Sequence, residues 1–153
     1  MTPPPIRRSV TVRCGTEEAF DLFTQGMAGW WPLETHSRAA SEFDGEGVRS
    51  VGLSFEPRVG GTLVERLSNG LELPWGEVLV WEPPSRFVLA WKPHGRDEPP
   101  TELEVSFSER GDETVVELEH RGWERLARPE AYESYSDGWG LTLDRFASMV
   151  APR

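Results

Sequence analysis

The chain has 153 residues and a formal net charge of −10 at pH 7, with seven tryptophans and one cysteine. The negative charge argues against nucleic acid and anionic membrane surfaces as partners, because both require a basic surface on the protein. A single cysteine excludes an internal disulfide, and no apolar run approaches the roughly 20 residues that span a bilayer. The reducing cytoplasm is therefore the expected location.

The N-terminal part is predicted to form a strand, a helix and a long loop. Residues 1–5 are rich in proline and are expected to be a poorly ordered lead-in. Alternating residues over 7–13 predict a strand. Thr16 is expected to cap the following helix through its hydroxyl, and that helix should end near Gly26. The polar segment 34–47 is unusually long for a loop in a compact domain and suggests a mobile lid.

The middle of the chain is predicted to be an antiparallel meander. Short runs of strand-forming residues alternate with turn signals, the clearest of which is Asn69-Gly70, a typical hairpin turn. The predicted strands cover residues 51–56, 62–67, 71–81, 86–91, 101–108 and 114–120.

Residues 129–150 are predicted to form one long amphipathic helix. Gly138 and Gly140 inside it each cost about 1 kcal/mol relative to alanine, which suggests close approach of the helix to a neighbouring group beside Trp139. The order of elements predicts a single α+β domain over 1–153, in which this helix covers the sheet. Its apolar face is formed by residues spaced three or four apart: Tyr132, Tyr135, Trp139, Leu143, Phe146 and Val150.

Several segments together resemble a known family. They are Glu18-Ala19-Phe20, Trp30-Trp31-Pro32, the run from Phe55 to Gly61 with Glu65, Trp75-Gly76-Glu77, Trp81-Glu82-Pro83-Pro84, His120 with Gly122-Trp123, and Gly138-Trp139. The chain is similar to activator of Hsp90 ATPase homologue 1-like proteins of the START-like (SRPBCC) superfamily. The resemblance implies a helix-grip fold, in which a curved antiparallel sheet wraps around a long C-terminal helix and encloses an apolar cavity. Because this superfamily includes lipid carriers, aromatic polyketide cyclases and self-sacrificing resistance proteins, the fold leaves the function open.

Two polar residues are candidates for the inside of this cavity. If Phe107 pairs with Val116, then Leu103 faces His120, and His120 points inward at the end of an apolar row. Glu65 shares a strand face with Leu63. Each has an alternative interpretation: a histidine hydrogen-bonded near the sheet edge, or a solvated carboxylate at the rim. On the outer face of the same hairpin Glu104 faces Glu119, which suggests a solvated acidic surface or one that opposes a basic partner.

Large aromatic residues are candidates for the cavity wall. Trp75, Trp91 and Trp139 come from different elements, and packing only as core filler is the alternative for each. Trp30 and Trp31 could lie at the cavity mouth or anchor the first helix. The candidate ligand-binding residues are Trp30, Trp31, Glu65, Trp75, Trp91, His120, Tyr135 and Trp139.

No cofactor or metal is predicted. The three histidines, His36, His94 and His120, lie far apart and form no metal-ligand pattern, and no phosphate-binding glycine loop is present. No residue is assigned as catalytic, because no nucleophile or cofactor motif accompanies the Glu65 and His120 pair.

Three functions follow from these observations. The first is binding of a small hydrophobic or aromatic molecule in the cavity, without catalysis. The second is an enzyme of cyclase or hydrolase type that uses His120 and Glu65 for proton transfer. The third is a chaperone-regulating interaction domain. An interior void with convergent polar groups favours the first two. The sequence leaves the oligomeric state open, and a homodimer is one of the states considered.

Overall fold

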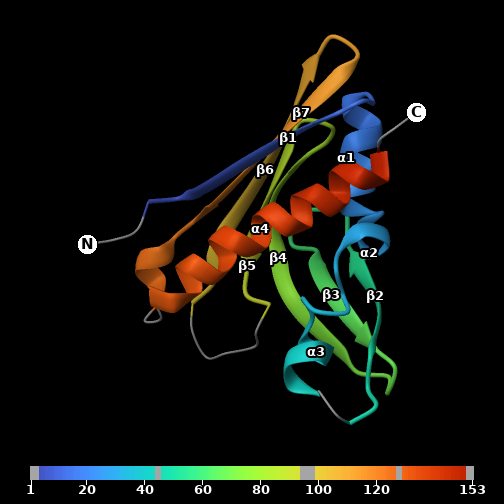
Figure 1. The fold of residues 1–153 in the computed structure, drawn as a ribbon, viewed down its shortest axis with the longest axis vertical. Coiled ribbons are helices and arrows are strands. Elements are labelled where there is room, and N and C mark those ends of the chain that lie inside the picture. The colour runs from blue at the N-terminus through green and yellow to red at the C-terminus, as the bar shows by residue number, and fades with distance from the viewer. Residues whose placement is uncertain (1–3, 44–45, 94–98, 127–128, 151–153) are drawn as a thin grey trace.

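The computed structural model describes residues 4–43, 46–93, 99–126 and 129–150. The proposed lead-in at 1–5 therefore lies mostly outside the described residues, and so does part of the predicted loop at 34–47. The elements, shown in Figure 1, are β1 (Ile6–Val12), α1 (Thr16–Thr24), α2 (Met27–Trp30), α3 (Arg38–Glu42), β2 (Ser50–Phe55), β3 (Thr62–Leu67), β4 (Glu72–Glu82), β5 (Arg86–Trp91), β6 (Thr101–Arg110), β7 (Glu113–Arg121), the 3₁₀ turn η1 (Trp123–Arg125) and α4 (Pro129–Val150).

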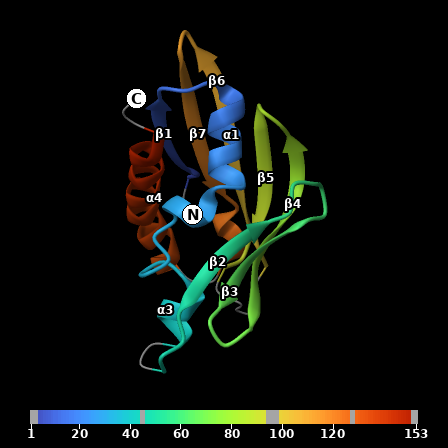
Figure 2. The ribbon, with the colours of Figure 1, turned by 90° about the vertical axis from the view of Figure 1, so that its right-hand side faces the viewer.

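Seven strands form one antiparallel sheet in the order β1-β7-β6-β5-β4-β3-β2. Strands β2 to β7 form the predicted meander, and β1 joins it by pairing with β7. The pairing register shifts in β2–β3, β3–β4 and β4–β5. Such irregularities increase the local bend and twist of a strand. Figure 2 shows the sheet bending round from β1 and β7 towards β2 and β3.

Helix α4 lies across this curved sheet, as Figure 1 shows. Its apolar residues Trp139, Leu143, Phe146 and Val150 are buried in the core, and Tyr132 and Tyr135 pack against it from partly buried positions. The predicted helix face and the helix-grip fold are thus confirmed. Burial of this stripe holds the helix in place, because helix propensity alone contributes little over so polar a sequence.

The first helix begins differently from the prediction. Its N-cap is Gly15, which makes no side-chain hydrogen bond, and Thr16 is already the first helical residue. The amide of Ala19 donates to the carbonyl of Gly15, which starts the hydrogen-bonded turn one residue earlier than expected. The prediction that the Thr16 hydroxyl caps this helix is therefore wrong. The short helices α2 and α3 were not predicted, because four or five residues are too few to show a helical period.

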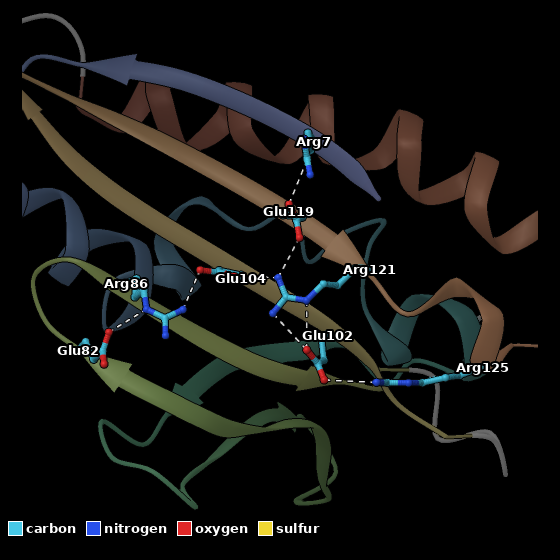
Figure 3. Close-up of polar contacts among 8 residues, drawn as sticks. All are labelled: Arg7, Glu82, Arg86, Glu102, Glu104, Glu119, Arg121 and Arg125. Atoms are coloured by element: carbon cyan, nitrogen blue, oxygen red, sulfur yellow. Dashed lines mark hydrogen bonds and ion pairs between the residues drawn. The ribbon is translucent and has the colours of Figure 1, made fainter. Parts of the chain in front are cut away.

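The predicted register of the last hairpin is confirmed. Leu103 lies opposite His120, Phe107 opposite Val116, and Glu104 opposite Glu119. The expected acidic outer face is instead a network of alternating charges (Figure 3). Arg121 contacts Glu102 at 3.1 Å, Glu104 at 2.7 Å and Glu119 at 3.0 Å.

This network extends over five neighbouring strands. From Arg121 it continues through Glu119 to Arg7 on β1, and through Glu104 to Arg86 on β5. Arg86 also contacts Glu82 on β4 at 2.8 Å. Burial alone would raise the pKa of Glu104, but hydrogen bonds from Arg121 and Arg86 outweigh it and hold that pKa below its ordinary value. We name this set of connected residues the outer ion network: Arg7, Glu82, Arg86, Glu102, Glu104, Glu119 and Arg121.

Arg121 should therefore contribute more to stability than an isolated surface arginine. We expect Arg121→Ala to lower the free energy of unfolding by about 1–3 kcal/mol, because it leaves three carboxylates close together without their shared cation. The matched control is Arg66→Ala, since Arg66 pairs with Glu72 at 3.3 Å and these side chains are 57% and 61% exposed, against 30% for Arg121. Chemical denaturation of both variants compares them, and equal losses would contradict a cooperative network.

Candidate functional site

A cavity of about 400 Å³ lies between α4, the segment that joins α2 to α3, and strands β4 and β5. The sheet and α4 contribute most of its aromatic walls, and its polar side chains come from the joining segment, the start of α3 and α4. The lining residues in the described part of the chain are Trp31, Thr35, His36, Ser37, Arg38, Trp75, Trp91, Pro93, Ala131, Ser134, Tyr135, Gly138, Trp139 and Thr142.

Four tryptophans from four different elements pack together around this cavity. Trp31 follows α2, and its ring centroid lies 5.4 Å from that of Trp75 on β4 and 5.7 Å from that of Trp139 on α4. Trp91 on β5 lies 5.5 Å from Trp139. Tyr135, one turn before Trp139, stacks on it at an interplanar angle of 22°. We name Trp31, Trp75, Trp91 and Trp139 the tryptophan quartet.

Every indole N–H of the quartet is hydrogen-bonded within the protein. Trp31 donates to the carbonyl of His36 at 2.7 Å, and Trp91 donates to the Tyr135 hydroxyl at 3.3 Å. Trp75 donates to Glu65 and Trp139 to His120, both at 3.0 Å. The quartet therefore offers a ligand ring faces and edges but no free donor.

Glu65 holds the segment that forms the polar wall. Its side chain is fully buried on β3, and one carboxylate oxygen accepts the backbone N–H of Arg38 at 2.8 Å and the indole N–H of Trp75. The other oxygen accepts the backbone N–H of Ala39 at 3.1 Å. These amides belong to the first turn of α3 and have no partner within the helix. The structure thus places Glu65 outside the cavity lining, as an anchor for α3.

His120 is also fully buried and lies outside the lining. Because an indole nitrogen can only donate, Nδ1 of His120 must accept the hydrogen bond from Trp139. Its proton is then on Nε2, which donates to Thr101 Oγ1 at 2.6 Å, while Thr101 donates to the carbonyl of Trp91. Burial lowers the pKa of His120 to about 3. The ring is therefore neutral at physiological pH, and both of its nitrogens are occupied.

The polar wall of the cavity comes from residues that the sequence analysis did not select: Thr35, His36, Ser37 and Arg38. His36 Nδ1 lies 2.7 Å from Thr35 Oγ1. Its Nε2 faces α4, since a Cβ built on Gly138 would lie 3.9 Å from that atom. The predicted close approach at Gly138 is thus to His36, whereas a Cβ on Gly140 would meet nothing within 4 Å.

The candidate residues divide into two groups. Trp31, Trp75, Trp91, Tyr135 and Trp139 line the cavity. Trp30, Glu65 and His120 are buried around it; Trp30 donates to the carbonyl of Leu22 and packs on Phe23 and Phe146. A signal for the missed residues was available, because a polar segment long enough to act as a lid contained both His36 and Arg38, and a glycine interrupted the helix opposite it.

A family model for "Activator of Hsp90 ATPase homolog 1-like protein" matches residues 14–151. The chain belongs to this family. The resemblance deduced from the sequence motifs is thereby confirmed. No curated protein matches the chain.

Solved structures similar to this family member include the anthrahydroquino-γ-pyrone synthase Txn09. It is 31% identical with a TM-score of 0.59, and the match covers 96% of this chain and 97% of that one. Protein CV1439 from Chromobacterium violaceum is 19% identical with a TM-score of 0.68, covering 99% and 100%. The Aha1 dimer from Colwellia psychrerythraea is 15% identical with a TM-score of 0.67, covering 97% and 96%. The last two likenesses concern the fold alone.

Two features are absent from the described residues. None of the helices resolved there is long and apolar enough to cross a membrane. Within the same ranges, no group of three histidine, cysteine or acidic side chains is arranged to hold a metal ion. His94 lies outside the described residues.

The buried neutral His120 should make stability depend on pH. Its folded-state pKa of about 3 lies below its ordinary value of 6.5, so only the unfolded chain takes up the proton between these values. This contribution is fully present above pH 6.5 and is lost as the pH falls towards 3, by about 1.4 kcal/mol per pH unit. Between pH 6.5 and 5 we expect the wild type to lose about 2 kcal/mol more than His120→Gln, measured by urea unfolding. Parallel pH profiles would contradict this.

The three hydrogen bonds to Glu65 should anchor α3. We expect Glu65→Gln to lower the free energy of unfolding by about 2–3 kcal/mol. The side-chain NH₂ group of glutamine is itself a donor, and it would lie opposite an N–H donor where a carboxylate oxygen now accepts. Hydrogen exchange should be slow at the amides of Arg38 and Ala39 in the wild type and fast in the variant. Glu77→Gln on the neighbouring strand β4 is the control, since Glu77 is exposed and should change stability by less than about 0.5 kcal/mol. Unchanged protection of the two amides in Glu65→Gln would show that another contact holds α3.

Proposed function

We propose that this protein binds a small planar aromatic molecule in the cavity beneath α4. The observation that carries the proposal is the tryptophan quartet, whose rings surround a void of about 400 Å³ while all four N–H groups bond to the protein. Aromatic rings attract other rings through offset and edge-to-face contacts. A wall of such rings without free donors favours a flat apolar body over a polar one.

The size of the cavity narrows the class of ligand. Pockets for small molecules typically measure about 300–1,000 Å³, and this cavity lies near the lower limit. That volume suits a compound of a few fused rings better than a long-chain lipid. The similarity to a synthase named for an anthrahydroquinone-pyrone product supports an aromatic ligand, because the match extends over nearly all of both chains.

A cavity enzyme of cyclase type is the second candidate, and the same similarity favours it. Proton transfer by His120 and Glu65 does not fit their contacts, since both nitrogens of His120 and both oxygens of Glu65 are bonded inside the protein. In the described part of the cavity lining, the imidazole of His36 is the group suited to carry a proton. A catalytic role predicts that His36→Gln removes turnover while leaving binding largely intact.

An interaction domain that regulates a chaperone is supported less well. The tryptophan quartet is buried and offers little surface to a protein partner, and the solved Aha1 structure shares only 15% identity with this chain. The interior void and its convergent polar groups are the features that favour a small ligand.

Two glycines in α4 provide a matched test of the binding site. We expect 2-amino-1,4-naphthoquinone, an uncharged two-ring probe, to quench tryptophan fluorescence on binding to the wild type. Gly138→Ala should weaken binding several-fold, since its new methyl group enters the cavity beside His36, whereas Gly140→Ala should leave it unchanged. Both substitutions should stabilise the helix by up to about 1 kcal/mol, so neither result can be attributed to unfolding.

The outcomes decide whether the probe binds in this cavity. Saturable quenching that Gly138→Ala weakens and Gly140→Ala does not would support binding in this cavity. The absence of saturable quenching in the wild type, or an equal effect of the two substitutions, would count against it.

A further inference from the structure

We propose that His36 is a specificity-determining residue of this cavity and recognises an uncharged hydroxyl group on the edge of the aromatic ligand. This inference rests on the proposed function and deepens it, because it narrows the ligand class to planar hydroxyaromatic, or phenol-type, compounds. The atom that makes the contact is Nε2 of the His36 ring, which lines the cavity beside Gly138 on α4.

The other polar atoms of His36 are already paired inside the protein. Its backbone N–H donates to the carbonyl of Pro32 at 2.7 Å, and its carbonyl accepts the indole N–H of Trp31 at 2.7 Å. Its Nδ1 lies 2.7 Å from Thr35 Oγ1. Nε2 makes no hydrogen bond to any residue in the described ranges, so it is available to a ligand.

These contacts hold the His36 ring in place before a ligand arrives. The two backbone hydrogen bonds fix the chain at this residue, and turning the ring would break the contact between Nδ1 and Thr35. The chain that follows is also held, because Ser37 Oγ caps α3 and Glu65 accepts amides of its first turn. A preorganised group loses little freedom on binding, which favours affinity.

Gly138 keeps the approach to Nε2 open on the side of α4. A Cβ built on this glycine would lie 3.9 Å from Nε2, so any side chain here would occupy the space in front of that atom. A ligand oxygen would lie about 2.9 Å from Nε2 in a hydrogen bond. Trp139, the next residue on α4, belongs to the quartet, so a ring packed on the quartet has its edge near this opening.

The chemistry of imidazole favours a hydroxyl over other oxygen groups. A neutral imidazole has one donor and one acceptor nitrogen, and the Thr35 hydroxyl can pair with Nδ1 in either form because it both donates and accepts. Nε2 therefore donates in one tautomer and accepts in the other. A ligand hydroxyl pairs with both tautomers, whereas a carbonyl oxygen pairs only with the one that donates.

The size of the effect follows from what Nε2 loses beside an apolar ligand. A methyl group in place of the hydroxyl would separate Nε2 from water without offering it a hydrogen bond. Because His36 is half-buried, this loss should lie in the lower part of the range for buried polar groups, and it corresponds to about tenfold in affinity.

A pair of probes of nearly the same shape tests the proposal. 2-Naphthol and 2-methylnaphthalene are both uncharged at neutral pH and differ by a hydroxyl against a methyl group. Calorimetry gives the ratio of their affinities for the wild type and for His36→Phe, which keeps a ring but offers no polar atom. The two probes differ in hydration equally for both proteins, so a change in the ratio isolates the contact with His36. We expect the ratio to fall about tenfold in His36→Phe.

Two further variants serve as controls. His36→Gln should keep most of the wild-type ratio, because glutamine can place an amide near the position of Nε2. Ser134→Ala removes the hydroxyl of another lining residue and should leave the ratio unchanged. Affinity for 2-methylnaphthalene within about twofold of the wild type shows that each variant is folded with its cavity intact.

A measurement on the wild type alone keeps the proposal testable if His36→Phe does not fold. In protein labelled with ¹⁵N-histidine, the Nε2 resonance of His36 should shift with 2-naphthol and much less with 2-methylnaphthalene. His120 provides the reference within the same spectrum, because both of its nitrogens are bonded inside the protein.

The results that would overturn the proposal are distinct from those that would overturn the proposed function. If both probes bind and the ratio is the same in the wild type and His36→Phe, the hydroxyl is not recognised by His36 while the cavity still binds aromatic molecules. A fall in the ratio that is as large in Ser134→Ala, or an Nε2 resonance that responds equally to both probes, also overturns the inference. If neither probe binds the wild type, the proposed function itself fails.

Discussion

Four indole N–H groups that surround a void have to find acceptors inside the protein, and the rest of the site is organised around that constraint. A buried donor without a partner costs about 1–3 kcal/mol, so four unpaired donors could cost about as much as the whole stability of a typical domain, which is about 5–15 kcal/mol. Each acceptor comes from a different place: Glu65 on β3, the carbonyl of His36, the hydroxyl of Tyr135 and the ring of His120. The aromatic wall and its polar partners therefore form a single connected structure.

This connection explains how a short segment becomes part of the site. Helix α3 has five residues, too few to be stable by itself. It is held because the carboxylate that accepts the Trp75 indole also accepts two amides of its first turn. The same segment carries His36 and Arg38 to the cavity. A residue that looks like a catalytic acid in the sequence thus acts by holding the backbone of the segment that lines the cavity.

The sequence predicted the fold well because the fold depends on periodicity. Alternation in the strands gave the pairing of Leu103 with His120, and the three-and-four spacing gave the buried face of α4. It indicated that His120 faces inward and left open which side Glu65 faces. It could not show which groups they bond, because their partners Trp139, Trp75 and Arg38 lie 10 or more residues away along the chain. The polar wall was missed for a related reason: α3 is too short for periodicity, and its position depends on a single buried carboxylate.

The hydrogen bonds of the quartet also limit how this cavity can diversify in evolution. Replacing Trp139 by phenylalanine would keep an aromatic ring but leave Nδ1 of His120 buried without a donor, and replacing Trp75 would take one donor from Glu65. Changes in the quartet must therefore occur together with changes in its hydrogen-bond partners. The same space is also lined on α4 by Ala131, Ser134 and Gly138. None of these three makes a described side-chain hydrogen bond to the quartet. Single mutations at these three positions of α4 can therefore reshape the cavity, while the quartet, including Trp139 on the same helix, stays fixed by its hydrogen-bond partners.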